Sequence, residues 1–296
     1  MSKKSPSAFP GERIAAGVAL GAVAVGAAAL VVGSQCLQLV RTKAGMARVK
    51  KVRDVEGNAV RVLQQGGVYQ SATYLDERRF EPVFAYYRAF DRMFDAEGAM
   101  RTVTGHGIDR VLVMGGGGYA YPKHALTERV RLKMDVVEID PAVTRLARRW
   151  FYLDDLEAIA GARLGLIEDD ARSYVSRALA EGRRYDAIVN DCFSGAEPVR
   201  PLSTVEVLCQ AKVCLNPGGL YLANVVSESG GEDVSFLRDV MATAAAVFAH
   251  VHVIPCEDAS FAAEDNYLVI ATDGEYAFEG ELEFGEGVYG SVMRDA

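Results

Sequence analysis

The sequence has few of the residues that build metal sites or disulfide frameworks. It contains four histidines and five cysteines, with no C-x-x-C pair and no histidine at zinc-ligand spacing. An odd number of unclustered cysteines agrees with a reducing, cytoplasmic environment. We expect no metal and no permanently bound cofactor. Cys192 is expected to be a small buried residue and not a nucleophile, because no histidine lies near it in the sequence.

Acidic residues outnumber basic residues beyond residue 53. Residues 1–53 carry nine Lys and Arg against one acid, a net charge of +8, so the rest of a chain with total charge −8 carries −16. A nucleic-acid-binding protein presents a basic face, and an acidic body argues against that class. With 296 residues, half of them hydrophobic, the chain is long and apolar enough for one large domain or two.

Charge is missing altogether from Ile14 to Gly33, and the uncharged run continues to Val40. About 20 residues at 1.5 Å each cross a hydrocarbon core. The run therefore predicts one transmembrane helix over 14–40, after a short flank over 1–13. A cleaved signal peptide and a buried helix of small residues are the alternatives, but this run is longer than a typical signal-peptide core.

Six Lys and Arg follow this run closely, against three before it. The positive-inside rule places the body in the cytoplasm, so we expect a single-pass protein of the cell membrane. The basic residues belong to a predicted juxtamembrane linker over 41–54, which is expected to rest against anionic head groups.

Residues 55–296 form three segments that differ in their sequence pattern. Residues 55–103 predict a small β region followed by a helix over about 76–96, in which aromatic residues recur at steps of three and four. Residues 104–272 alternate short apolar runs with helical stretches, and residues 273–296 look like a loosely packed acidic tail.

The alternation over 104–272 predicts an α/β fold. Seven apolar runs are expected to be strands, at 111–114, 134–139, 163–167, 185–189, 220–225, 252–256 and 267–272. Helices are expected to start near Pro141, Ala171, Thr204 and Val234. This order is typical of an open, mostly parallel seven-stranded sheet that is covered on both faces.

A glycine-rich loop follows the first of these strands. Gly115 to Ala120 satisfy G-x-G-x-x-A, where glycines let the chain turn sharply and let a ligand approach the backbone. The next strand ends about 20 residues later at Glu138, where a carboxylate accepts hydrogen bonds from ribose hydroxyls. Together, Gly115, Gly117 and Glu138 predict a nucleoside site.

Two further strands end in carboxylates. Asp170 and Ala171 follow the strand over 163–167, where an adenine amino group would lie; the alternative is that Asp170 only caps the helix. Asp191 ends the strand over 185–189, the expected place for chemistry in such a sheet. Its alternative is a structural carboxylate that neighbouring backbone amides satisfy.

The blocks VLVMGGGG, VEIDPAV, EDDARSYV, YDAIVNDCFS, PLSTVE and LNPGGLYLANVVS resemble, in order and spacing, the spermidine synthase (polyamine aminopropyltransferase) family. The resemblance covers about 55–272 and identifies this chain as a divergent member of the family. The predicted N-terminal membrane anchor precedes that range. It implies a methyltransferase-like Rossmann fold after a small β region, a homodimer, and no metal.

The resemblance also implies roles for residues. Decarboxylated S-adenosylmethionine would bind along the donor residues, which are Gly115, Gly117, Glu138, Asp170 and Ala171. Asp191 matches the acid that assists the attacking amine, which must be unprotonated to act as a nucleophile. Gln70 and Ser194 would lie on the acceptor side.

Three departures change the acceptor half. Ser194 stands where the family has the second acid of its motif, and Gly118 stands where an acid usually follows three glycines. Residues 80–82 replace a Tyr-His-Glu triplet of the family. Polyamines carry several charges, and each buried ammonium must be paired. Putrescine is therefore doubtful as the acceptor.

The sequence is compatible with three alternative functions. The first is a spermidine-synthase-like transferase that alkylates an amine from an adenosyl sulfonium donor, either decarboxylated S-adenosylmethionine or S-adenosylmethionine. The second is an S-adenosylmethionine-dependent methyltransferase, in which Lys123 would pair with the methionine carboxylate. The alternative for Lys123 is an ordinary surface lysine. The third is a non-catalytic, membrane-anchored nucleoside-binding protein. An NAD-dependent dehydrogenase fits less well, because the blocks around Asp170 and Asp191 are not expected there.

Overall fold

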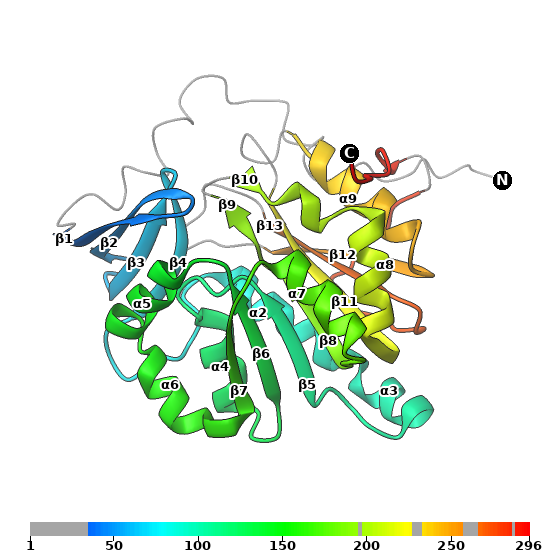
Figure 1. Cartoon of the computed structure of the whole chain (residues 1–296), viewed down its shortest axis with the longest axis horizontal. Coiled ribbons are helices and arrows are strands. Elements are labelled where there is room, and N and C mark those ends of the chain that lie inside the picture. The colour runs from blue at the N-terminus through cyan, green and yellow to red at the C-terminus, as the bar shows by residue number, and fades with distance from the viewer. Residues whose placement is uncertain (1–34, 195–196, 227–232, 257–265, 286–287) are drawn as a thin grey trace.

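Two sheets organise the protein in the computed structural model, which describes residues 35–194, 197–226, 233–256, 266–285 and 288–296 (Figure 1). The first has four strands in the order β1-β2-β3-β4, and the second has seven in the order β12-β13-β11-β8-β5-β6-β7. A short pair, β9 (Phe193–Ser194) and β10 (Glu197–Pro198), lies between them (Figure 1).

The small sheet is antiparallel throughout and begins earlier in the chain than the sequence predicts. Its strands are β1 (Gln35–Thr42), β2 (Gly45–Arg53), β3 (Ala59–Gln65) and β4 (Val68–Tyr74). The predicted linker over 41–54 is therefore wrong, since these residues form most of a hairpin. In β2 the buried Ala47 and Val49 alternate with basic residues, which is a strand pattern that the net charge obscured.

The predicted transmembrane helix over 14–40 falls mainly on residues 14–34, which lie outside the described residues. Its last residues, 35–40, belong to β1, so the predicted C-terminal end of that helix was wrong. Along the described part of the chain, no helix combines the length and the apolar character needed to cross a membrane.

The large sheet confirms the predicted mostly parallel seven-stranded α/β architecture. Its strands are β5 (Arg110–Met114), β6 (Lys133–Glu138), β7 (Leu164–Glu168), β8 (Tyr185–Asn190), β11 (Leu215–Val226), β12 (His250–Cys256) and β13 (Asn266–Thr272). All neighbouring strands are parallel except β13, which runs antiparallel to both β11 and β12, so the sheet is mixed.

Helices cover both faces of this sheet. They are α4 (Ala120–Glu128), α5 (Pro141–Trp150), α6 (Leu153–Ala160), α7 (Ala171–Ala180), α8 (Val205–Cys214) and α9 (Ser235–Ala245), with short turns η3 (Gly161–Arg163) and η4 (Arg200–Leu202). The four predicted helix starts hold to within one residue. Alternate residues of β5 enter two cores: Val111 and Val113 join the small sheet and α4–α6, while Leu112 and Met114 join α7–α9.

The helix predicted over 76–96 starts late. The structure has α2 (Ala85–Ala89), η2 (Phe90–Ala96) and α3 (Glu97–Thr104), while residues 76–84 form turns. Pro82 explains the delay, because it lacks a backbone donor and disfavours helix at the residue before it. The aromatic spacing still identified buried residues, including Phe84, Phe90 and Phe94.

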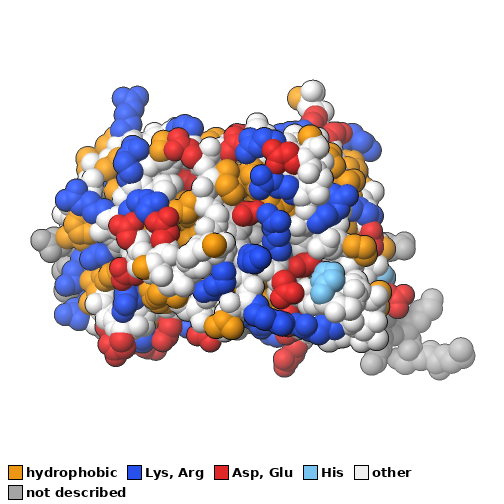
Figure 2. Space-filling model, turned by 60° about the horizontal axis from the view of Figure 1, so that its bottom comes forward, with side chains coloured by type: hydrophobic (Ala, Val, Ile, Leu, Met, Phe, Trp, Pro, Cys, Tyr) orange, Lys and Arg blue, Asp and Glu red, His pale blue; other side chains and the backbone are white. Residues whose placement is uncertain are grey.

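Lys and Arg side chains are interspersed with Asp and Glu on the lower face of the molecule, which comes forward in Figure 2. A stripe of one sign is absent from this view of the described residues. Mixed charge of this kind is typical of a solvated face and differs from the basic footprint of a nucleic-acid-binding surface.

The acidic tail is packed, contrary to the sequence prediction. Phe278 is 6% exposed and meets the His252 ring edge-to-face, with 4.8 Å between ring centroids. Near the C-terminus, Asp295 accepts hydrogen bonds from Arg172 at 2.8 Å and from Thr204 at 2.9 Å. Seven acids and one basic residue give this segment its negative charge, but the apolar residues between them pack against the core.

We therefore expect Phe278→Ala to lower the free energy of unfolding by about 3–5 kcal/mol, because it removes a buried ring and leaves a cavity. Chemical denaturation followed by circular dichroism measures this change. Val292→Ala, at a tail residue that is 43% exposed, is the matched control and should shift stability little. Equal effects of the two substitutions would contradict the packed tail.

Candidate active site

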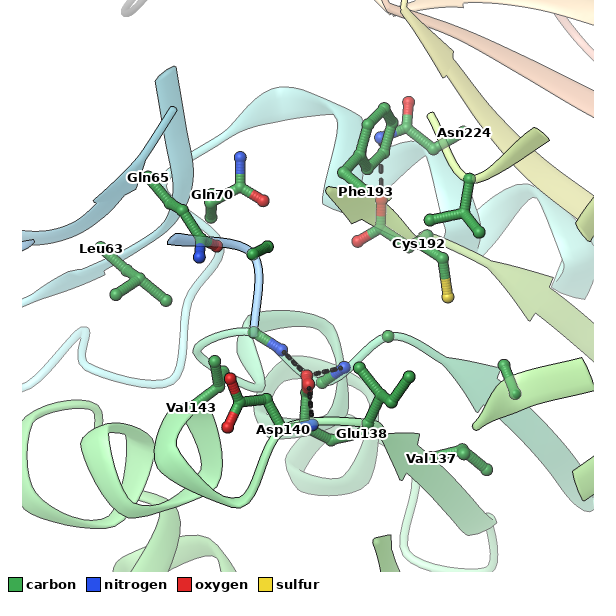
Figure 3. Close-up of a pocket in the computed structure, with 18 of the residues that line it drawn as sticks. Leu63, Gln65, Gln70, Val137, Glu138, Asp140, Val143, Cys192, Phe193 and Asn224 are labelled. Carbon is green, nitrogen blue, oxygen red and sulfur yellow. Dashed lines mark hydrogen bonds between the residues drawn. The ribbon is translucent and has the colours of Figure 1, made fainter. Parts of the chain in front are cut away.

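A cavity lies at the carboxyl ends of the strands, between the large sheet, the small sheet and α2 (Figure 3). It is centred where β5 and β8 lie side by side. The chain leaves β5 toward β6 on one side and leaves β8 toward β11 on the other. Such a switch point is the place where open α/β sheets bind ligands.

The glycine loop lines this cavity, and its backbone adopts conformations that favour glycine. Gly115 has φ +98°, and a Cβ on it would lie 2.3 Å from the backbone oxygen of Asp191. Gly117 has φ +50°, in the left-handed region that favours glycine. The loop thus brings the ends of β5 and β8 together.

Glu138 holds this loop in place. Its carboxylate accepts backbone N–H groups from Gly116 at 3.0 Å, from Gly117 at 3.1 Å and from Asp140 at 2.9 Å (Figure 3). Burial raises the pKa of Glu138, and the three amides oppose that rise by stabilising the charged form. Glu138 is therefore a structural anchor of the loop as well as a lining residue of the cavity.

The turn between β1 and β2 closes over the same edge. Thr42, Lys43 and Ala44 line the cavity. The backbone N–H of Lys43 donates to Asp140 Oδ2, and its ammonium donates to the carbonyl oxygen of Ile139 at 2.6 Å. These residues were missed from the sequence, because a basic stretch after an apolar run was interpreted as a membrane-proximal linker.

The third strand end places Asp169, Asp170 and Ala171 in the cavity wall. Asp170 Oδ1 accepts the backbone N–H of Ser173 at 2.9 Å and so caps α7. The capping role that the sequence left open is present. It leaves the second carboxylate oxygen of Asp170 for a ligand, since a carboxylate has two oxygens.

Asp191 lines the cavity directly after β8. Its Oδ1 accepts a hydrogen bond from Asn224 Nδ2 at 2.9 Å (Figure 3). Burial raises the pKa of Asp191 to about 6, and the Asn224 contact opposes the rise. A carboxylate with such a pKa is suited to exchange protons near neutral pH. Asn224 was missed, although it ends a buried strand at the same edge as Asp191.

Aromatic and amide side chains form the remaining wall. Tyr69, Gln70, Tyr86 and Tyr87 line it from β4 and α2. The Tyr87 hydroxyl donates to the backbone oxygen of Gln70 at 3.3 Å, and burial raises the pKa of Tyr87, which keeps the phenol neutral. Ser194, predicted on the acceptor side, is exposed and is not among the described lining residues.

The structure explains why position 118 carries no acid. A Cβ on Gly118 would lie 2.5 Å from Ser71 Oγ and 3.0 Å from a ring carbon of Phe151. Contacts this short are not tolerated without rearrangement. A side chain at this position would therefore require Ser71 and Phe151 to move.

Lys123 is neither a surface lysine nor a partner for a donor carboxylate, so both expectations were wrong. It is 1% exposed, lies outside the cavity lining and donates from Nζ to Thr73 Oγ1 at 3.0 Å. Burial lowers the pKa of Lys123 to about 7. Within the described ranges, no three His, Cys, Asp or Glu side chains gather as a metal-ligand set.

Comparison with known proteins places the chain in a family. A model described as spermine/spermidine synthase domain matches residues 98–256. The polyamine aminopropyltransferase of Vibrio vulnificus is 35% identical over 121 residues, 41% of this chain and 39% of that protein. That of Aeropyrum pernix is 30% identical over 185 residues, 61% of this chain and 57% of that protein. The matches thus span less than two thirds of these relatives.

Solved structures show the same fold. A probable spermidine synthase from Corynebacterium glutamicum aligns with TM-score 0.60 and 24% identity over 81% of both chains. Human methyltransferase-like protein 13 aligns with TM-score 0.52 and 20% identity over 67% of this chain and 85% of that chain. Since the domain model covers more than half of the sequence, the chain belongs to the spermine/spermidine synthase family.

Proposed function

We propose that the chain is a transferase that moves an aminopropyl group from decarboxylated S-adenosylmethionine to an amine. The observation that carries this proposal is the position of Asp191. Its backbone meets Gly115 of the glycine loop, and its half-buried carboxylate, with a pKa raised to about 6, lines the cavity. A proton acceptor thus lies beside the loop expected to hold the nucleoside.

The nucleoside would lie across the ends of β6 and β7. Glu138 already accepts three amides, and a carboxylate offers about four acceptor positions. One ribose hydroxyl can therefore bind without rearrangement, and a second would displace a loop amide. Asp170, with Ala171 at the start of α7, offers the adenine edge an acceptor and a helix N-terminus.

The transfer needs no further activation, because the sulfonium makes its neighbouring carbon electrophilic. The amine nitrogen forms a bond to that carbon, the carbon–sulfur bond breaks, and its electron pair leaves on the neutral thioether methylthioadenosine. Asp191 takes the proton that the nitrogen loses.

A methyltransferase is the second candidate, because the fold also aligns with human methyltransferase-like protein 13. S-adenosylmethionine carries a carboxylate that favours a cationic partner. Lys43 is the one cation among the described lining residues, and its ammonium is bonded to the carbonyl of Ile139. This arrangement favours the decarboxylated donor.

We also propose that residues 14–34 anchor the protein in the cell membrane, with the described domain in the cytoplasm. The support is the uncharged sequence directly before β1 and the excess of Lys and Arg after it. Full-length protein should remain in the membrane fraction after a carbonate wash, and Val25→Asp should release it. Recovery of the unaltered chain in the supernatant would contradict the anchor.

Donor binding is tested at Asp170. We expect Asp170→Ser to keep the helix cap but to weaken methylthioadenosine binding at least tenfold, because a charged hydrogen bond is lost. Isothermal titration calorimetry measures the affinity, and thermal unfolding checks the fold. Asp155→Ser, on α6 away from the cavity, is the control. Unchanged affinity in Asp170→Ser would remove the adenine assignment.

Proton transfer is tested at Asp191. Asp191→Asn should retain methylthioadenosine binding and lower kcat about a hundredfold or more, the usual effect of losing a general base. In the unaltered enzyme, kcat should fall as the pH drops below about 6, since the protonated acid no longer accepts a proton. The measurement is kcat against pH with the best amine from a screen. A variant as active as the unaltered enzyme would refute this role.

A further inference from the structure

Charge is distributed unevenly around the cavity. Among the described lining residues there are five carboxylates, and four of them follow β6 or β7 on the nucleoside side: Glu138, Asp140, Asp169 and Asp170. Each of these four already has a partner in the chain, either a backbone N–H or, for Asp169, Arg177. Asp191 is the one described lining carboxylate outside that side, and its partner is the neutral amide of Asn224.

The wall around Asp191 is otherwise uncharged in the described structure. It consists of aromatic rings and amides from β4, α2, β9, β11 and β13, namely Tyr69, Gln70, Tyr86, Tyr87, Phe193, Asn224 and Asn266. The rings of Tyr86 and Tyr87 lie 4.1 Å apart between centroids. Flat rings and amides of this kind fit an uncharged chain or ring.

Asn224 has one unsatisfied atom in this wall. Its Oδ1 is buried without a hydrogen-bond partner, while its Nδ2 donates to Asp191. The reverse amide orientation would put two oxygens together, so the contact with Asp191 fixes Oδ1 as the free acceptor. A buried acceptor without a partner is unfavourable, and an N–H donor from a ligand would satisfy it.

A diamine does not fit this arrangement well. Its first ammonium can bind Asp191 and Asn224, but along the described wall its second must leave water among rings and amides. The desolvation free energy of a buried, unpaired ammonium exceeds the stabilisation that cation–π attraction to a ring provides. Ser194, which stands where the family has a second acid, is exposed and outside the described lining.

We propose that the acceptor is an amine with a single positive charge, whose nitrogen binds between Asp191 and Asn224 Oδ1. Its uncharged remainder lies along the wall that Tyr86 and Tyr87 form. This inference rests on the proposed function and names the substrate class of the same site. Asn224 acts as a positioning residue, because it holds both Asp191 and the amine.

The test separates the acceptor from the donor. Full-length protein is saturated with methylthioadenosine and titrated with n-butylamine or with 1,4-diaminobutane, which differ only in the second amino group. We expect n-butylamine to bind at least tenfold more tightly. Equal or tighter binding of the diamine would overturn this inference and leave the proposed function intact. Failure of methylthioadenosine itself to bind would refute the proposed function, and the inference with it.

Two variants test which wall residues contact the acceptor amine. Asn224→Leu should weaken n-butylamine binding at least tenfold at unchanged methylthioadenosine affinity. Asn266→Asp should strengthen 1,4-diaminobutane binding at least tenfold, because it adds a carboxylate to the neutral wall. Gln210→Glu adds the same charge on α8, outside the cavity lining, and controls for overall charge. Unchanged binding in either variant would contradict the assigned wall.

Discussion

The site depends on one carboxylate. Glu138 collects three backbone N–H groups, two from the glycine loop and one from the start of the next helix. These bonds fix the loop after β5 against the end of β6, and the missing side chain of Gly115 lets the same loop touch the backbone of Asp191. The ends of three neighbouring strands are thereby held in one arrangement before any ligand binds. Preorganisation of this kind lowers the cost of binding.

The small sheet completes the site. Its first turn binds Asp140 and the carbonyl of Ile139 through Lys43, so strands early in the chain form a wall over the nucleoside side. Ser71 in β4 packs so closely on Gly118 that no side chain fits there. The absence of a side chain at position 118 is therefore linked to how the two sheets pack.

The two halves of the cavity have different chemistry. Carboxylates and helix N-termini gather at the ends of β6 and β7, where a nucleoside needs acceptors and donors. Around Asp191, the described wall is aromatic and amide-bearing, and one buried amide oxygen of Asn224 has no partner. The described cavity therefore has one end rich in carboxylates and another end rich in rings and amides.

The sequence alone determined the seven-stranded α/β sheet and the order of its elements, because buried strands and capped helices leave local patterns of hydrophobicity. It also identified the strand-end residues at positions 115, 138, 170 and 191, since parallel strands bring their carboxyl ends to one edge. Only the tertiary structure decided the role of the β1–β2 hairpin, the burial of Lys123 and the pairing of Asn224 with Asp191. Each of these depends on contacts between segments far apart in the chain, which leave no periodic signal in the sequence.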